Sequence, residues 1–157
     1  MKKKRVVIIS LLLLLVSVIG ISSYFLFKDK INLLDVDHSD VDWNGKKQKD
    51  TSGEENTIAI PGFEKVTLYA NETTQAVNFH NPEINDCYFK ISLIHPDGSV
   101  LWISDLIEPG KGMYSIELEK TLAVGEYENA VLKYECFSLN DQSPLNGSEI
   151  NLKLVVV

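Results

Sequence analysis

The 157-residue sequence is poor in the residues and motifs that build catalytic and metal sites. It has two cysteines and three histidines, without the C-x-x-C or paired-histidine spacing of zinc sites. G-x-S-x-G, H-E-x-x-H and G-x-x-x-x-G-K-[ST] are missing, which argues against serine hydrolases, zinc proteases and P-loop NTPases. Acidic residues outnumber basic ones by 22 to 15, so the basic footprint of a nucleic-acid binder is lacking. We therefore predict a protein that is not an enzyme, has no catalytic, cofactor-binding or metal-ligating residues, and binds no nucleic acid.

One long apolar run lies near the amino terminus. Residues 6–27 read VVIISLLLLLVSVIGISSYFLF, without a charge or a proline. A helix of this length covers about 33 Å, which is enough for the hydrocarbon core of a bilayer. Three lysines and Arg5 lie in the basic tail before the run, so the positive-inside rule places residues 1–5 in the cytoplasm. We predict a single-pass signal-anchor in the cell membrane, with the rest of the chain extracellular and the lipid bilayer as one partner.

A cleaved secretory signal is the alternative interpretation of the same segment. Such signals share the basic start, but their apolar region usually has about 7 to 15 residues and ends at a small-x-small cleavage site. The run here is longer, and Gly20-Ile21-Ser22 is its one such match. Both interpretations export the remainder of the chain.

Residues 28–56 are rich in Asp, Lys, Gly and Ser and lack apolar periodicity. Such a composition buries too little surface to offset the entropy of ordering, so we predict a disordered acidic and polar spacer. Its aspartates suggest calcium, but an EF-hand loop needs Gly at position 6 and Glu at position 12. Counted from the first aspartate those positions hold Asp and Lys, so a solvated stalk is the preferred interpretation; the aspartates are Asp35, Asp37, Asp40 and Asp42.

The folded domain is predicted at residues 57–157, where short β-like runs are separated by turns rich in Pro and Gly. Period-two alternation of apolar and polar residues is clearest in Cys87–His95, Gly112–Glu119 and Glu126–Ser138. His95-Pro-Asp-Gly-Ser99 predicts a tight hairpin. The pattern indicates an all-β antiparallel sandwich of about 7 to 8 strands, with runs at Thr57–Ile60, Lys65–Ala70, Gln75–Asn81, Cys87–His95, Ser99–Ser104, Gly112–Glu119, Glu126–Ser138 and Ser148–Val157.

The two cysteines both lie on apolar faces of predicted strands. Cys87 opens its strand and Cys136 lies near the end of another, so antiparallel neighbours would bring them within bridging reach. An even count in an exported chain favours a disulfide, and we predict this bond, with two buried free thiols as the alternative.

Cys87, Trp102 and Tyr134-Glu-Cys136 loosely match the Cys…Trp…Tyr-x-Cys pattern, so this part resembles an immunoglobulin-like β-sandwich. The resemblance gives structural roles to Trp102 and to a corner tyrosine. Tyr134 has the right spacing to the cysteine, whereas Tyr127 has the preferred place at the start of its strand. Cys87 directly precedes the hairpin, one strand later than in immunoglobulins, so the resemblance concerns architecture.

Four runs extend the likeness over nearly the whole exported part, namely IPGF, VNFHNPEINDCYFKISLI, LWISDLIEPGK and GEYENAVLKYECFSL. They resemble a family of small uncharacterised Gram-positive surface proteins that have one membrane segment, a spacer and this domain. Some members are labelled tRNA uracil methyltransferase, but this chain lacks the glycine-rich α/β core which that chemistry requires.

The resemblance and the residues together predict a non-enzymatic binding or accessory module of a cell-surface assembly. Its partner would be a surface protein or a cell-wall component. One alternative is a chaperone-like or strand-exchanging polymerising subunit, because an apolar terminal strand at Ile150–Val157 could add to another sheet if it lay on an edge. An exported hydrolase that uses a pair of carboxylates is the weaker alternative.

Overall fold

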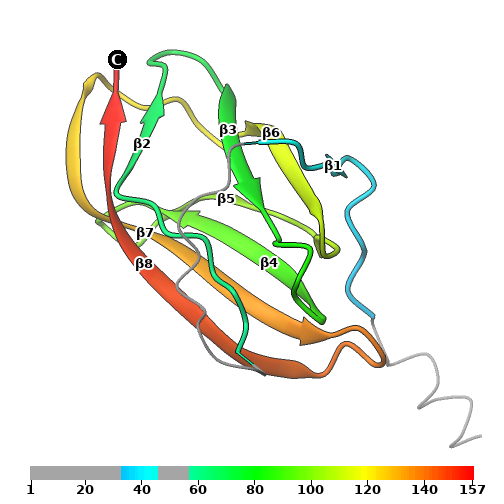
Figure 1. The fold of residues 1–157 in the computed structure, drawn as a ribbon. Helices are drawn as coiled ribbons and strands as arrows, with labels where there is room; N and C mark the ends of the chain where they lie inside the picture. The colour runs from blue at the N-terminus through cyan, green and yellow to red at the C-terminus, as the bar shows by residue number, and fades with distance from the viewer. Residues whose placement is uncertain (1–32, 46–56) are drawn as a thin grey trace, which may run out of the picture. The chain divides into compact units, whose positions relative to one another are not determined.

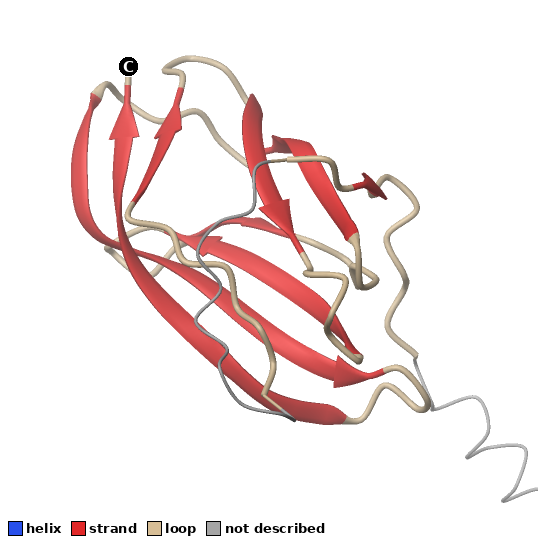
Figure 2. Cartoon of the chain, viewed as in Figure 1, coloured by secondary structure: helices blue, strands red, loops and turns tan. Residues whose placement is uncertain are grey.

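The computed structural model describes residues 33–45 and 57–157, and the described chain is all-β (Figure 2). The predicted span at residues 6–27 and the basic tail before it lie outside the described residues. Within the described ranges, no helix is long and apolar enough to cross a bilayer.

Within the described residues, eight strands form two sheets (Figure 1). The five-stranded sheet has the order β2-β8-β7-β4-β5, and the three-stranded sheet has the order β1-β6-β3. Strand β2 runs parallel to β8, and the other neighbouring strands are antiparallel. The strands are β1 (Val41–Asp42), β2 (Lys65–Leu68), β3 (Thr74–His80), β4 (Cys87–Ile94), β5 (Val100–Ile103), β6 (Lys111–Glu117), β7 (Gly125–Ser138) and β8 (Pro144–Val156).

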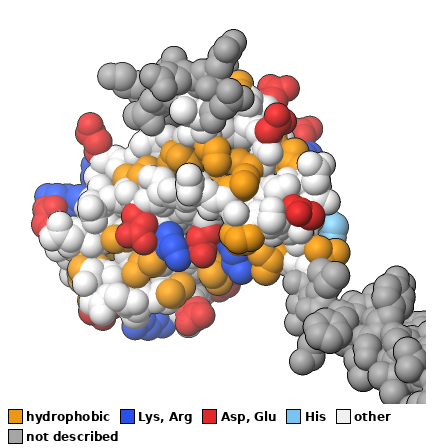
Figure 3. Space-filling view, turned by 90° about the horizontal axis from the view of Figure 1, so that it is seen from below, with side chains coloured by type: hydrophobic (Ala, Val, Ile, Leu, Met, Phe, Trp, Pro, Cys, Tyr) orange, Lys and Arg blue, Asp and Glu red, His pale blue; other side chains and the backbone are white. Residues whose placement is uncertain are grey.

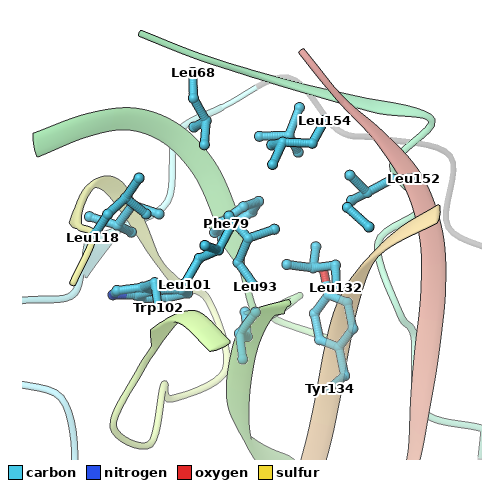
Figure 4. Packing of buried hydrophobic residues seen from close by; sticks show 14 of the residues in the cluster. Leu68, Phe79, Leu93, Leu101, Trp102, Leu118, Leu132, Tyr134, Leu152 and Leu154 are labelled. Carbon is cyan, nitrogen blue, oxygen red and sulfur yellow. The ribbon is translucent and has the colours of Figure 1, made fainter. Parts of the chain in front are cut away.

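The alternation seen in the sequence corresponds to the two faces of the sheets. In β4, Phe89, Ile91 and Leu93 are buried, and they lie opposite Cys136, Tyr134 and Leu132 of β7. These side chains meet residues of the three-stranded sheet in one core, where Phe79 of β3 lies near Leu93 and Trp102 (Figure 4). Burial of this apolar surface, at about 25 cal/mol per Å², is the main force that holds the two sheets together.

The predicted hairpin between β4 and β5 is confirmed. The amide of Gly98 donates to the carbonyl of His95 at 2.8 Å, and Gly98 has a φ of 86°, which a residue with a Cβ rarely adopts. Asp97 Oδ1 accepts the Ser99 amide at 2.8 Å, and its bonds to Ser99 hold the pKa of Asp97 below the ordinary range.

Three features differ from the sequence prediction. Residues 57–60 form no strand, although Thr57–Ile60 is one of the predicted runs. Asn146-Gly147 is not a turn, because it lies within β8 at a bulge opposite β7. The terminal strand is not an edge over Lys153–Val156, since β2 pairs with it on one side and β7 on the other. Strand addition needs an exposed edge, and this pairing leaves none along that part of the terminal strand.

Candidate functional site

The predicted disulfide is not formed: Cys87 and Cys136 are both buried free thiols. The pairing register gives the reason, because Cys87 lies opposite Ser138 and Cys136 lies opposite Phe89. The cysteines are therefore diagonal neighbours on one face of a single sheet. The hydrogen bond between the thiols and their burial together raise the pKa of the Cys136 thiol well above its usual value, so that thiol stays protonated.

We expect two reactive thiols per chain after denaturation without reductant, and none in the native protein, because both side chains are only 1% exposed. Titration with a chromogenic disulfide reagent, with and without guanidinium, measures both numbers. The same titration after reduction is the control. A denatured chain that gives thiols only after reduction would show a disulfide and refute the structure at this point.

Trp102 and Tyr134 both lie in the core. Trp102 of β5 stacks on Phe79 of β3 at a centroid distance of 5.8 Å, which joins the two sheets far from the cysteines. Tyr134 is 1% exposed and packs edge-on against Phe89. Burial raises the pKa of the Tyr134 hydroxyl well above its ordinary value. Both residues are structural parts of the fold.

Tyr127 makes the contact expected of a corner tyrosine. Its hydroxyl donates to the carbonyl of Ala123, four residues upstream, at 2.9 Å. A tyrosine at the start of a long strand whose hydroxyl bonds back to the preceding loop is the feature seen at the E–F corner of immunoglobulin-like sandwiches. The Tyr134 hydroxyl instead donates to the carbonyl of Pro61 at 3.5 Å, distant in the sequence.

Residues 34–44, here called the N-terminal arm, fall in the predicted spacer but are bound to the domain. The Gln142 side chain clamps both backbone groups of Leu34, donating to its carbonyl at 3.0 Å and accepting its amide at 2.7 Å. Val36 forms a parallel bridge to Leu106, and Val41–Asp42 is strand β1 on the edge of β6. This part of the predicted disordered spacer therefore belongs to the same compact unit as the sheets.

Trp43 fixes the carboxyl end of the arm. Its indole lies flat on His80, with ring centroids 3.8 Å apart and planes within 10°, and its Nε1 donates to Asn78 Oδ1 at 2.7 Å. The contact requires glycine in β6, because a Cβ at Gly112 would lie 2.8 Å from His80 Cβ and 2.9 Å from Trp43 Cδ1. The Trp43 ring thus packs against the backbone of β6 and the end of β3.

Trp43 also lines a cleft of about 500 Å³. The cleft lies where the arm meets the β3–β4 loop and the turn before β6, and it combines aromatic, apolar and charged groups. The Asn44 amide donates to the Tyr114 hydroxyl at 2.8 Å beside it. Its lining residues are Asp42, Trp43, Asn44, Gly45, His80, Pro82, Glu83, Ile84, Pro109, Gly110 and Lys111.

Some of the described charged residues in the cleft form ion pairs with each other, and others do not. Lys111 Nζ lies 2.7 Å from Asp42 Oδ1, and this bond lowers the pKa of Asp42 and raises that of Lys111. Behind the pair, partial burial and the neighbouring Asp37 raise the pKa of Asp40. Glu83 is exposed and makes no hydrogen bond or ion pair with any residue that the structure describes. The lining of the cleft therefore includes both a carboxylate and an aromatic ring.

The β3–β4 loop that carries Glu83 is held rigidly by two buried asparagines. Asn81 Nδ2 donates to the carbonyls of Cys87 and Ile107 at 2.8 and 3.0 Å, and Asn81 Oδ1 accepts a bond from Asn85 Nδ2 at 2.8 Å. Asn85 also bonds both backbone groups of Ala59. Because every polar atom of this network has a partner, the loop between the asparagines is fixed in place.

Ile84, at the tip of this loop, is 71% exposed. It lies between the Trp43 cleft and a second hollow of about 770 Å³, whose lining includes Ile58, Ile60 and Leu145. An isolated exposed isoleucine is common on protein surfaces, but Ile84 joins the apolar lining of two neighbouring hollows. We define the Ile84 end of the domain as Trp43, Glu83, Ile84 and the lining of the two hollows.

Within residues 33–45 and 57–157, no group of three or more His, Cys, Asp or Glu side chains could hold a metal ion. His38 lies in the arm, His80 lies under Trp43, and His95 lies in the β4–β5 hairpin beside Tyr127. The four aspartates of the arm are spread along its length in different contacts.

No family model matches the chain, and no curated protein or solved structure shows significant similarity to it.

Sequence reasoning missed Trp43 and Glu83. The available signal was the spacing of Val36, Val41 and Trp43, which are apolar residues within an otherwise acidic stretch. Average composition over a long window hides such residues. Val41 itself stays exposed, and it joins the sheet through backbone pairing with β6.

Proposed function

We propose that the protein is a single-pass, membrane-anchored extracellular binding module without enzymatic activity, and that it contacts its partner through the Ile84 end. The uncharged run at residues 6–27 and the basic tail before it support the anchor and its orientation. One cleft combines a ring, a rigid loop and a carboxylate that has no partner among the described residues, and this combination supports binding. The partner is a protein of the same cell surface.

We further propose that the domain is immunoglobulin-like. In such sandwiches strands B and E are neighbours in one sheet, and C, F and G are neighbours in the other. The pair β3-β6 and the run β8-β7-β4 have this arrangement, and β5 extends the second sheet. Strand β1 of the arm takes the place beside β6 that strand D has in that fold. The Tyr127 corner bond also supports this assignment.

The resemblance of the runs around β3, β4 and β7 to small Gram-positive surface proteins supports the same proposal. That family combines one membrane segment, a spacer and a β domain, which is the organisation proposed here. The arm modifies this organisation, because part of the spacer is bound to the domain.

The single observation that carries the proposal is the position of Ile84, an exposed apolar side chain on a rigid loop between two hollows. Val124 provides a matched control, since it is equally exposed, at 72%, in the β6–β7 loop at the opposite end of the strands (Figure 1). Both native cysteines are buried, so a cysteine introduced at either site carries the only accessible thiol among the described residues.

The test uses intact cells that express full-length Ile84→Cys or Val124→Cys. A membrane-impermeant maleimide should label both variants from outside, which checks the orientation. A membrane-impermeant bifunctional maleimide–amine crosslinker should give a discrete larger product with Ile84→Cys and none with Val124→Cys. Labelling that requires permeabilised cells would refute the extracellular assignment. Equal crosslinking at the two sites, or none at either, would refute the Ile84 end as the binding surface.

A further inference from the structure

Trp43 and Glu83 line the same cleft, and both lie close to Gly110. The Trp43 amide donates to the Gly110 carbonyl at 3.0 Å. A Cβ at Gly110 would lie 3.6 Å from both Cβ and Cγ of Glu83. Gly110 has a φ of 78°, a conformation that suits glycine, so the turn that sets this spacing depends on that residue.

The domain around the cleft is strongly acidic. The described residues contain 6 lysines, no arginine, and 18 aspartates and glutamates, a net charge of −12. Figure 3 shows acidic side chains spread over the face seen from below, with apolar side chains and some lysines between them. Among the residues that the structure describes, Lys111 is the only cation that lines the cleft, and it is paired with Asp42. The net charge of the described residues favours a cationic ligand, and so does Glu83, which has no partner among those residues.

A flat ring beside a carboxylate distinguishes between the two common cationic side chains. A guanidinium stacks on an indole through its own plane and donates two parallel hydrogen bonds to one carboxylate. A lysine ammonium is a compact, strongly hydrated charge that gains less from a flat surface. The orientation of the Trp43 ring is fixed by the stack on His80 and by the Nε1 bond to Asn78.

We propose that the Trp43 cleft binds an arginine side chain of a partner polypeptide. The guanidinium stacks on Trp43 and bonds to Glu83, and the aliphatic stem lies against the apolar lining that Pro82, Ile84 and Pro109 provide. This inference rests on the proposed binding function and names the chemistry of the partner at that same surface.

The protein carries its own reporter for this contact. It has two tryptophans: Trp43 lines the cleft, and Trp102 is buried in the core. A ligand in the cleft should change the fluorescence of Trp43 and leave that of Trp102 unchanged.

The test titrates full-length protein in detergent micelles with acetyl-Gly-Arg-Gly-amide, followed by tryptophan fluorescence. The matched probes replace arginine by citrulline, which keeps the shape without the charge, or by lysine, which keeps the charge without the plane. We expect saturable binding of the arginine peptide, with citrulline weaker by about tenfold and lysine by about threefold. Equal affinity for citrulline would overturn the cationic assignment, and equal affinity for lysine would overturn the guanidinium assignment.

Two variants assign the signal to the cleft. Glu83→Gln should weaken arginine binding by about fivefold. Glu119→Gln removes an exposed carboxylate beyond the far end of β6 and should leave the affinity unchanged. Equal affinities in the two variants would overturn the role of Glu83. If the arginine peptide fails to bind while Ile84→Cys still crosslinks on cells, the partner chemistry is wrong and the binding function stands; if both fail, the binding function is wrong as well.

Discussion

Replacing Asn81 by alanine is expected to lower the free energy of unfolding by about 3 to 5 kcal/mol. The Asn81 side chain is fully buried and joins three groups: the carbonyls of Cys87 and Ile107 and the amide of Asn85. Alanine leaves all three without this partner, and each buried polar group left unsatisfied costs about 1 to 3 kcal/mol. Urea unfolding followed by circular dichroism measures the change.

Asn140→Ala is the matched control, because Asn140 is exposed in the β7–β8 turn and its side chain makes no bond to the described residues. We expect that variant to stay within about 0.5 kcal/mol of the parent. An Asn81→Ala protein as stable as Asn140→Ala would show that the asparagine network does not hold the β3–β4 loop.

Trp43→Ala is expected to release the N-terminal arm and to lower the free energy of unfolding by about 2 kcal/mol. A fully buried tryptophan typically contributes 3 to 5 kcal/mol, and Trp43 is only partly buried. The variant loses the stack on His80 and the bond to Asn78, which leaves β1 with few other contacts at that end. Hydrogen exchange of peptides covering residues 34–44 should become much faster, whereas exchange in β4 and β7 should change little.

Trp43→Phe is the informative companion variant. Phenylalanine keeps a ring over His80 but lacks the Nε1 donor, so we expect arm protection between that of the parent and that of Trp43→Ala. If arm exchange were unaltered in Trp43→Ala, then Gln142 and the Leu106 bridge alone would hold the arm, and the packing of Trp43 would not be needed for docking.

Most of the sheet strands could be predicted because burial on one face leaves a period of two in the sequence. Ile91, Ile116 and Leu152 each lie between polar neighbours and are buried in the core as expected. Alternation does not encode register, however. The cysteines are on the right strands and the right face, but an offset of two residues makes them diagonal neighbours.

The alternation within a strand also does not predict whether that strand lies at the edge or in the middle of its sheet. β8 has the apolar alternation of a terminal strand, yet β2, some 90 residues earlier, pairs with its last four residues and removes the exposed edge there. The sequence around Lys65 contains no sign of this parallel partner. Such pairings depend on contacts distant in the chain.

The candidate site was the least predictable part, because its residues come from three separate segments. Trp43, Glu83 and Gly110 have unremarkable sequence neighbourhoods, and only the turn before β6 brings them together. The acidic composition around Trp43 indicated a solvated stalk, whereas a few specific contacts order the arm. Composition predicts the average behaviour of a segment and misses an anchor made by one side chain.

The course of the arm determines how a pulling force would act on an anchored protein. Under the proposed topology, tension between the membrane and a bound partner enters the domain at Leu34, where Gln142 holds it, and not at the strands of the sheets. The arm, including its edge strand β1, then detaches one contact at a time, from Leu34 past the Leu106 bridge to Trp43, before the remaining strands β2 to β8 bear the load. Under force the arm would therefore extend first, while the hydrophobic core stays folded.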